Sequence, residues 1–158
     1  MTHHHLSIGD PAPQFTLINQ FEKKVTPMAL EGKRTLLSFH PLAWTSVCEI
    51  QMRSLDVKHA EFEKLGVIPY GISVDSVPCK KAWAESLGIS KTNMLSDFWP
   101  HGEIAEKFGV FNTEEGISAR VNILIGVDHR IEWIREYELI QIPDIEEILE
   151  VISSKNHE

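Results

Sequence analysis

The sequence has few cysteines and lacks several patterns that define common classes of protein. Its two cysteines, Cys48 and Cys79, form no C-x-x-C pair, so the zinc-ribbon and thioredoxin-type redox motifs are both absent. No apolar run reaches the length of a membrane span, and no signal core follows the N-terminus. We therefore expect a cytoplasmic protein without a membrane partner, in which a cysteine is more often catalytic or buried than disulfide-bonded.

Clustered positive charge is also absent, and this argues against nucleic acid as a partner. The net charge is -8, and lysine and arginine are spread along the chain. With 42% hydrophobic and 24% charged residues, the composition is that of a globular protein. The length predicts a single domain over residues 1–158, with residues 1–7, which include His3, His4 and His5, as a flexible N-terminal segment.

Hydrophobic periodicity predicts strands that alternate with helices. Residues 34–39 and 67–74 are apolar on both faces, which is typical of strands covered by helices on both sides. The other predicted strands are residues 15–18, 25–30, 94–95, 120–127 and 131–139, of which the first two form an N-terminal β-hairpin. The predicted helices run from Cys48 to Leu65, over 78–87, over 103–108, and from Pro143 onward. This order predicts an α/β three-layer sandwich with a mixed central sheet.

The stretch from the strand at 34–39 to Cys48 is the strongest candidate for a functional site. Pro41 ends the strand, Thr45 and Ser46 are N-cap residue types, and Cys48 then falls in the first turn of the following helix. Unpaired backbone N–H groups and the helix dipole favour negative charge there, which lowers the pKa of a thiol and makes it a better nucleophile. A cap at Thr45 can place its hydroxyl beside the sulfur. The pattern predicts a reactive cysteine.

This motif, Pro41-x-x-x-Thr45-x-x-Cys48, resembles the active-site signature of the peroxiredoxins, a thioredoxin-fold family of thiol peroxidases. Residues 9–15 (GDPAPQF) resemble the opening of that family, and residues 72–76 (ISVDS) resemble its second central strand. Residues 95–102 (LSDFWPHG) and 109–112 (GVFN) look like the branches related to alkyl hydroperoxide reductase E and to the bacterioferritin-comigratory proteins. The resemblance covers nearly the whole chain and implies a thioredoxin-like fold.

The resemblance also implies a role for individual residues. Cys48 corresponds to the cysteine that attacks the peroxide and becomes a sulfenic acid, and Thr45 to the hydroxyl that bonds substrate and sulfur. Pro41 corresponds to the ring that shields the thiolate from water, and Arg120 to a distant arginine whose fixed charge suits a thiolate. The implied substrates are hydrogen peroxide and organic hydroperoxides. The reductant would be a thioredoxin, a glutaredoxin or a small thiol, and no metal or organic cofactor is implied.

Three residues depart from the family pattern. His40 stands where tyrosine or phenylalanine is more frequent, and it either handles protons or packs beside the pocket. Gln51 replaces a common glutamate, and it would keep a hydrogen bond but lose the charge. Cys79 is not at a position expected for a resolving cysteine in the best-known branches. It is either the resolving thiol or a helix residue without a partner.

Large aromatic residues flank the candidate site on two loops. Trp44, Phe98 and Trp99 line a peroxide pocket, form a dimer contact or belong to the core. Because aromatic residues are enriched at interfaces, we expect a homodimer that uses these loops. Two alternatives to an antioxidant peroxidase stay open. One is a thiol–disulfide oxidoreductase without peroxidase activity, and the other is a non-catalytic thioredoxin-fold binding module.

Overall fold

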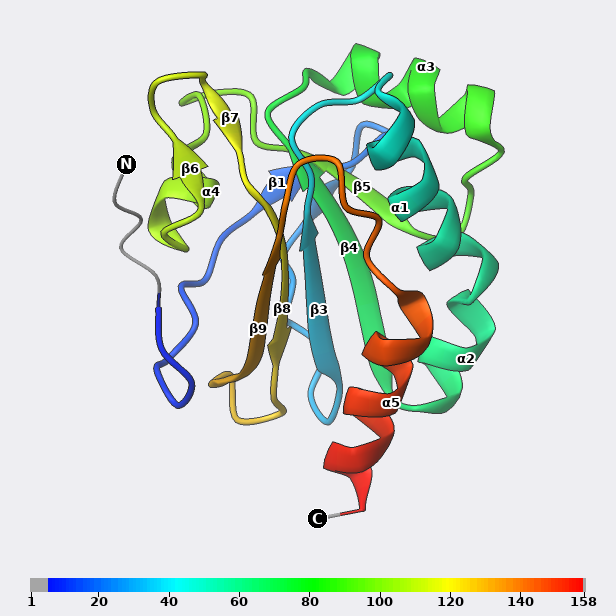
Figure 1. Cartoon of the computed structure of the whole chain (residues 1–158), viewed down its shortest axis with the longest axis vertical. Helices are drawn as coiled ribbons and strands as arrows, with labels where there is room; N and C mark the ends of the chain where they lie inside the picture. Colours follow the sequence, from blue (N-terminus) through cyan, green and yellow to red (C-terminus); the bar gives the residue numbers. More distant parts are fainter. Residues whose placement is uncertain (1–5, 158) are drawn as a thin grey trace.

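A seven-stranded mixed sheet forms the centre of the computed structural model, which describes residues 6–157 (Figure 1). Its strand order is β2-β1-β5-β4-β3-β8-β9, and β6 pairs separately with β7. The strands are β1 (Leu17–Ile18), β2 (Lys24–Val25), β3 (Arg34–Phe39), β4 (Val67–Ser73), β5 (Asn93–Ser96), β6 (Phe111–Asn112), β7 (Ile117–Ser118), β8 (Arg120–Ile125) and β9 (Ile131–Tyr137). The helices are α1 (Ser46–Val57), α2 (His59–Lys64), α3 (Val77–Leu87), α4 (Glu103–Lys107) and α5 (Ile145–Asn156).

The strand directions bring one set of loops to the same edge of the sheet. Strand β3 pairs parallel with β4 and antiparallel with β8, while β5 runs parallel to β4 and β9 antiparallel to β8. The carboxyl ends of β3, β4, β5 and β9 therefore meet at one edge, together with the first residue of β8. This is the edge at which open α/β sheets place their sites.

Two hydrophobic clusters cover the two faces of the sheet. Because side chains alternate along a strand, Leu36 and Leu37 of β3 point to opposite faces. Leu37 packs in a cluster with residues of α4 and the N-terminal segment, and Leu36 packs in a cluster with residues of α1, α2, α3 and α5. The predicted three-layer sandwich with a mixed sheet is therefore confirmed. No helix in residues 6–157 is long and apolar enough to cross a membrane.

The N-terminal hairpin is confirmed, although each of its strands has only two residues. Leu17 pairs with Val25, and β1 also joins β5 through Ile18. Residues 1–5 of the predicted flexible segment lie outside the described residues. The next residue, Leu6, packs against the first hydrophobic cluster, and the backbone N–H of Ser7 donates to the Asp10 carboxylate.

Three local predictions are wrong in detail. The helix predicted from Cys48 to Leu65 is two helices, α1 and α2, that meet at Lys58, where ψ is 12°. The break leaves no mark in the sequence because the apolar period continues across it. Pro143 does not open the last helix, because Asp144 is its N-cap and accepts the backbone N–H of Glu146. The β6–β7 hairpin was not predicted, since two-residue strands are too short to show a period.

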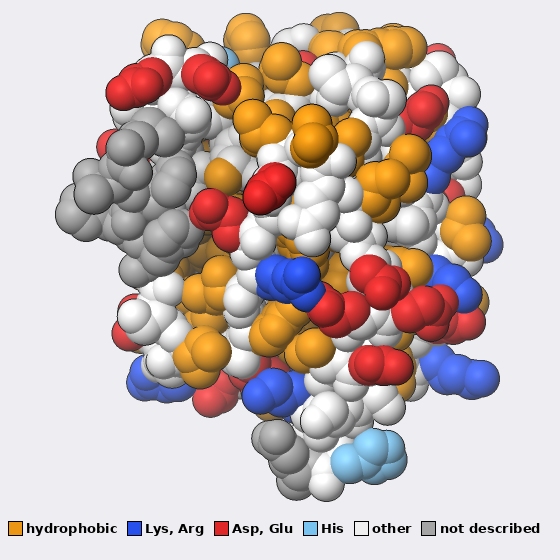
Figure 2. All heavy atoms as spheres, viewed as in Figure 1, with side chains coloured by type: hydrophobic (Ala, Val, Ile, Leu, Met, Phe, Trp, Pro, Cys, Tyr) orange, Lys and Arg blue, Asp and Glu red, His pale blue; other side chains and the backbone are white. Residues whose placement is uncertain are grey.

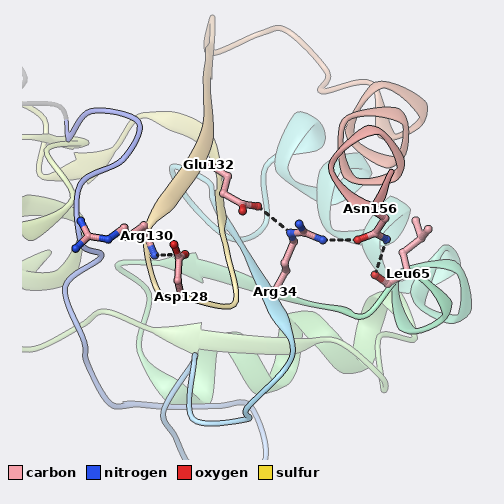
Figure 3. Close-up of polar contacts among 6 residues, drawn as sticks. All are labelled: Arg34, Leu65, Asp128, Arg130, Glu132 and Asn156. Carbon is pink, nitrogen blue, oxygen red and sulfur yellow. Dashed lines mark hydrogen bonds and ion pairs between the residues drawn. The ribbon is translucent and has the colours of Figure 1, made fainter. Parts of the chain in front are cut away.

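Polar contacts fix the edge of the sheet opposite to these loops (Figure 3). At the start of β3, the Arg34 Nε donates to Glu132 Oε1 at 2.8 Å, and its guanidinium also contacts the Asn156 side chain. The Asn156 amide in turn donates to the Leu65 carbonyl at 3.0 Å. These contacts connect β3, β9, the end of α5 and the end of α2 at the edge of the sheet that is far from the candidate site.

Candidate active site

Cys48 occupies the position that the sequence predicts, in the first turn of α1. Helix α1 begins at Ser46 after the extended N-cap residue Thr45, so Cys48 is its third residue. The side chain is fully buried, at 0% exposure. The Thr45 side chain does not cap the N–H groups of this turn, which therefore stay available to negative charge at the sulfur.

Arg120 lies directly against this sulfur, although the two residues are 72 positions apart in the sequence. Its NH1 donates to Cys48 Sγ at 3.3 Å and to Gln51 Oε1 at 2.7 Å. Its Nε and NH2 donate to the Leu139 carbonyl at 3.2 and 2.6 Å. These contacts leave the guanidinium a single orientation. Arg120 is thus a fixed positive charge beside the thiol, as the resemblance implied.

Gln51 keeps the predicted hydrogen bond to Arg120, and its other side-chain atom is engaged as well. Its Nε2 donates to Ser38 Oγ at 2.7 Å and to the Phe39 carbonyl at 3.3 Å. With the amide nitrogen held by these acceptors, the amide oxygen must face Arg120. Gln51 therefore orients the guanidinium through a neutral contact.

The loop before Cys48 is tightly turned. Trp44 has a φ of 68°, in the left-handed region that is uncommon for residues other than glycine. The Thr45 hydroxyl donates to the Leu42 carbonyl at 2.7 Å, so that carbonyl is its partner in this conformation. Pro41 is buried at the start of the loop. A surface hollow of about 260 Å³ adjoins the loop and is lined by Trp44, Thr45, Ser46, Glu49, Trp83 and Ser86.

Cys79 lies in the first turn of α3, but its surroundings differ from those of Cys48. It follows the N-cap Ser76, whose hydroxyl accepts the Cys79 backbone N–H at 3.4 Å. Its thiol is half-buried and donates to Asp75 Oδ1 at 3.7 Å. Burial and then the Asp75 carboxylate raise the pKa of the Cys79 thiol, against a hydrogen bond from the Trp44 side chain. In this conformation Cys79 is therefore held as a thiol.

Asp75 connects the two cysteine-bearing loops. Its Oδ2 accepts the backbone N–H of Ala43 at 2.8 Å and the hydroxyl of Ser73 at 2.6 Å, while Oδ1 faces Cys79. Ala43 belongs to the loop before Cys48, so one carboxylate holds that loop against the start of α3. Both cysteines are free thiols.

A buried pair that the sequence reasoning missed lies at the end of β3. His40 is buried, and its Nε2 lies 2.7 Å from the Nζ of Lys80, which is also fully buried. Burial lowers the pKa of Lys80 to about 7, and burial followed by the Lys80 charge lowers the pKa of His40 well below its usual value. Helical spacing would have revealed Lys80, since it shares the buried face of α3 with Trp83 and Ala84.

The three aromatic residues of the flanking loops are exposed, so the core alternative is wrong for them. Trp44, Phe98 and Trp99 are 58%, 51% and 82% exposed. Figure 2 shows hydrophobic side chains gathered over the upper part of the molecule, the end at which the β3–α1 and β9–α5 loops lie in Figure 1. Other exposed hydrophobic residues of these two loops are Leu42, Leu139, Ile140 and Ile142.

The fold is that of a thioredoxin-fold protein, and the buried cysteine–arginine pair at a helix start is its candidate thiol site. The AhpC/TSA family profile matches residues 8–134. Alkyl hydroperoxide reductase E of Mycobacterium tuberculosis is 39% identical over 121 residues, which cover 76% of this chain and 78% of that protein. A peroxiredoxin of Thermoplasma volcanium is 30% identical over 152 residues, which cover 93% of this chain and 73% of that protein.

Solved structures agree with these sequence relatives. The reduced 2-Cys peroxiredoxin of Plasmodium vivax superposes with a TM-score of 0.87 at 26% identity, over 96% of this chain and 83% of that chain. The chain therefore belongs to the AhpC/TSA family and is a peroxiredoxin-type thiol peroxidase. A peroxide is its substrate and a thiol its reductant. The comparisons give no support to a thiol–disulfide oxidoreductase without peroxidase activity.

Proposed function

We propose that Cys48 is the cysteine that reduces the peroxide. The observation that carries this assignment is the 3.3 Å contact between Arg120 NH1 and Cys48 Sγ at the uncapped start of α1. A guanidinium keeps its charge at every physiological pH, so it stabilises a thiolate rather than a thiol. Hydrogen peroxide and small organic hydroperoxides are the proposed substrates.

In the proposed reaction, the Cys48 thiolate attacks the terminal peroxide oxygen. A sulfur–oxygen bond forms while the oxygen–oxygen bond breaks, and the electron pair leaves with the second oxygen, which takes up a proton. The sulfur is oxidised to a sulfenic acid and the peroxide is reduced to an alcohol or water. Arg120 also stabilises the charge that grows on the departing oxygen. Thr45 would turn its hydroxyl from Leu42 to the peroxide, and Pro41 would keep water from the sulfur.

Cys79 is the proposed resolving cysteine. Its sulfur attacks the Cys48 sulfenic acid, a disulfide forms, and the hydroxyl group leaves as water. Asp75 is placed to take the proton of Cys79, since the thiol already points at its carboxylate. A disulfide needs Cα atoms within about 7 Å, and helices that follow neighbouring strands usually start further apart than this. We therefore expect that the first turn of α1 unwinds before the bridge closes, or that a partner subunit supplies Cys79. A thioredoxin, a glutaredoxin or a small thiol then reduces the disulfide.

Peroxide consumption by three proteins tests these assignments. We expect Cys48→Ser to consume no more peroxide than buffer does. Cys79→Ser should reduce its first equivalent of peroxide, after which an added thiol must reduce its Cys48 sulfenic acid directly rather than a disulfide. Mass spectrometry after one equivalent of peroxide should show a Cys48–Cys79 disulfide in the wild type and sulfenic or sulfinic acid in Cys79→Ser. Free Cys79 beside oxidised Cys48 in the wild type would instead show an enzyme that works with one cysteine.

A homodimer through the apolar loop edge is the proposed assembly. The exposed aromatic residues Trp44, Phe98 and Trp99 lie on loops at the carboxyl ends of β3 and β5, around the active site. Sedimentation at micromolar concentration should give the dimer mass for the wild type and the monomer mass for Trp99→Arg. Val57→Arg, at an exposed position of α1, is the matched control and should stay dimeric. A monomeric wild type would contradict the proposal.

The cytoplasm is the proposed location of the enzyme. Both cysteines are free thiols, and a catalytic thiol that cycles through a disulfide needs a supply of reductant. Fractionation of the source cells, with an antibody against the protein, should find it beside a cytoplasmic marker enzyme.

A further inference from the structure

Lys80 is a buried cation that the peroxidase assignment leaves without a role. Its side chain is fully buried, and its Nζ contacts the His40 ring at 2.7 Å and lies 5.2 Å from the centre of the Trp83 ring. Within residues 6–157, no carboxylate forms an ion pair with it. An ammonium in such a place costs stability, and groups kept at such a cost are concentrated at functional sites.

The contact between Lys80 and His40 is built by several elements. His40 Nδ1 lies 3.3 Å from the Ser38 carbonyl, so this nitrogen carries the proton and Nε2 accepts from Lys80. The backbone N–H of His40 donates to the Ile72 carbonyl, and its carbonyl accepts the Ser118 hydroxyl. Gly71 packs beside the ring, where a Cβ would lie at an ordinary contact distance of 3.4 Å from His40 Cε1 but only 2.4 Å from Met52 Sδ.

The same group of residues continues to the reactive sulfur. Ser38, whose carbonyl faces the His40 ring, accepts through its hydroxyl from Gln51. Gln51 in turn accepts from Arg120, which donates to Cys48. A chain of buried polar contacts therefore runs from Lys80 on α3 to the Cys48 sulfur on α1. This series of hydrogen bonds passes through an amide and a guanidinium, which do not relay protons. It therefore fixes the positions of the charged groups and is no path for protons.

We propose that Lys80 is a positioning residue for the peroxide reaction: its ammonium, held by His40, favours the Cys48 thiolate from the side of α3, as Arg120 does from β8. The inference rests on the assignment of Cys48 made above. It is supported by electrostatics, because the Cys48 charge stabilises the protonated form of Lys80, and by reciprocity the ammonium stabilises that charge. Four other charged or titratable groups act on the Lys80–His40 pair, and together with the pair they come from five elements or loops. These groups are Asp75, Cys48, Cys79 and Arg120.

This arrangement gives the peroxide rate a specific pH dependence. Burial lowers the pKa of Lys80 to about 7, with Asp75, Cys48 and Cys79 acting in the opposite direction. Below that pH the ammonium is present and supports the thiolate. As the pH rises past about 7 it loses its proton, and of the two cations only Arg120 then supports the thiolate.

The test is the rate constant for hydrogen peroxide between pH 5.5 and 9 in the reduced enzyme, followed by stopped-flow fluorescence. Lys80→Met should be about tenfold slower than the wild type at pH 6, from a charge interaction across a partly screened interior. The two profiles should converge above pH 8, where the wild-type lysine is neutral. Lys80→Arg keeps its charge and should remain fast at pH 6. Lys81→Met, at the exposed neighbouring position of α3, is the control and should follow the wild type.

Two results would overturn the inference. One is a Lys80→Met rate that is slower than the wild-type rate by the same factor at every pH, which would indicate only a structural role. The other is a pair of identical profiles. The Cys48→Ser variant separates this inference from the proposed function. If Cys48→Ser is inactive and either result is found, only the role of Lys80 is refuted. If Cys48→Ser is as active as the wild type, the proposed function is refuted.

A second measurement needs no substitution at Lys80. In protein with ¹⁵N-labelled lysine, the Nζ resonance of Lys80 reports its protonation directly. Its titration midpoint should be lower in Cys48→Ser than in the reduced wild type, because the serine carries no charge to stabilise the ammonium. An unchanged midpoint would show that Lys80 and Cys48 are not coupled, and would contradict the inference even if Lys80→Met did not fold.

Discussion

Two helix starts in this protein have the same local sequence design but different surroundings. Helices α1 and α3 each place a cysteine at their third residue, after a hydroxyl residue at the N-cap. In α3 the Ser76 hydroxyl caps the helix, whereas in α1 the Thr45 hydroxyl is turned to the Leu42 carbonyl. The first turn of α1 thus keeps unpaired N–H groups beside its cysteine, and α3 has fewer.

The charged neighbours of the two sulfurs have opposite signs. Cys48 is fully buried against the Arg120 guanidinium, while the half-buried Cys79 faces the Asp75 carboxylate. The helix dipole favours a thiolate at both places, yet within residues 6–157 only the Cys48 sulfur has a hydrogen bond from a cation. A helix start is therefore a weak indication of a reactive cysteine, and it is the charged neighbour supplied by the fold that distinguishes the proposed peroxidatic cysteine from the proposed resolving cysteine.

Replacing Arg120, the cation beside Cys48, should have the largest effect among the substitutions that test this comparison. Loss of one preorganised donor to a developing charge typically costs about 10²–10³ in rate, so Arg120→Met should slow peroxide reduction by that order. Stopped-flow kinetics with hydrogen peroxide measures the rate, and urea unfolding should show a much smaller relative change. Arg53→Met, at an exposed position of α1, is the control. Equal rates in Arg120→Met and the wild type would place Arg120 outside the reaction.

Replacing the buried cation near both sulfurs should stabilise the protein. Lys80→Met exchanges a buried charge for a hydrophobic side chain of similar volume, and the expected gain is about 1–4 kcal/mol at pH 6. Native Lys80 has its pKa lowered from 10.5 to about 7, so the cost of burying the charge is full below pH 7. Between pH 7 and pH 10.5 Lys80 is protonated in the unfolded chain but neutral in the folded protein. The free energy of unfolding of the wild type therefore rises with pH over this range.

The advantage of Lys80→Met in urea unfolding should therefore shrink as the pH increases from 7 toward 10.5. Reduced protein at pH 6, 8 and 10 covers this range. Lys81→Met is exposed and should stay within about 0.5 kcal/mol of the wild type at each pH. A destabilised Lys80→Met at pH 6 would show that the contact with His40 contributes more than burial costs.

Removing the anion from Cys79 should have the smallest effect and should make its thiol resemble that of Cys48. Burial raises the pKa of the Cys79 thiol most, and the Asp75 carboxylate adds to this. Asp75→Asn removes the charge, lowers that pKa and should speed alkylation by iodoacetamide about threefold at pH 7.5, because the thiolate is the reacting form.

The alkylation measurement is cleanest in the Cys48→Ser background, in which Cys79 is the only thiol. Asp128→Asn, in the β8–β9 turn at the opposite edge, is the control and should leave the rate unchanged. Slower alkylation in Asp75→Asn would mean that the carboxylate activates Cys79 even in the resting enzyme.

The regular elements of the fold could be predicted because burial on both faces leaves a clear pattern. Strand β3 begins and ends where the apolar run predicts, and α3 begins one residue before its predicted start. The division between α1 and α2 could not be predicted, since Leu55 and Phe62 keep the same buried face on either side of Lys58. The two-residue strands of the β6–β7 hairpin carry too few side chains to show alternation.

For the site, the sequence by itself determined the chemical groups and their local placement. Pro41, Thr45 and Cys48 lie within eight consecutive residues, so a strand end and a helix start suffice to bring them together. The position of Cys79 in the first turn of its own helix followed from the same local signals. Helix starts are built from neighbours in the chain, and their hydrogen-bond requirements are readable from residue types.

Only the tertiary structure decided which charge meets which sulfur. Arg120 reaches Cys48 because β8 pairs antiparallel with β3, and this pairing fixes contacts across 72 positions. Lys80 reaches His40 because β4 lies parallel to β3 and returns α3 to the same edge. Electrostatic interactions in a buried site depend on distance and on exclusion of water, and the order of residues along the chain specifies neither. The sequence therefore supplied two cysteines at two helix starts, and the packing of the sheet gave them their different neighbours.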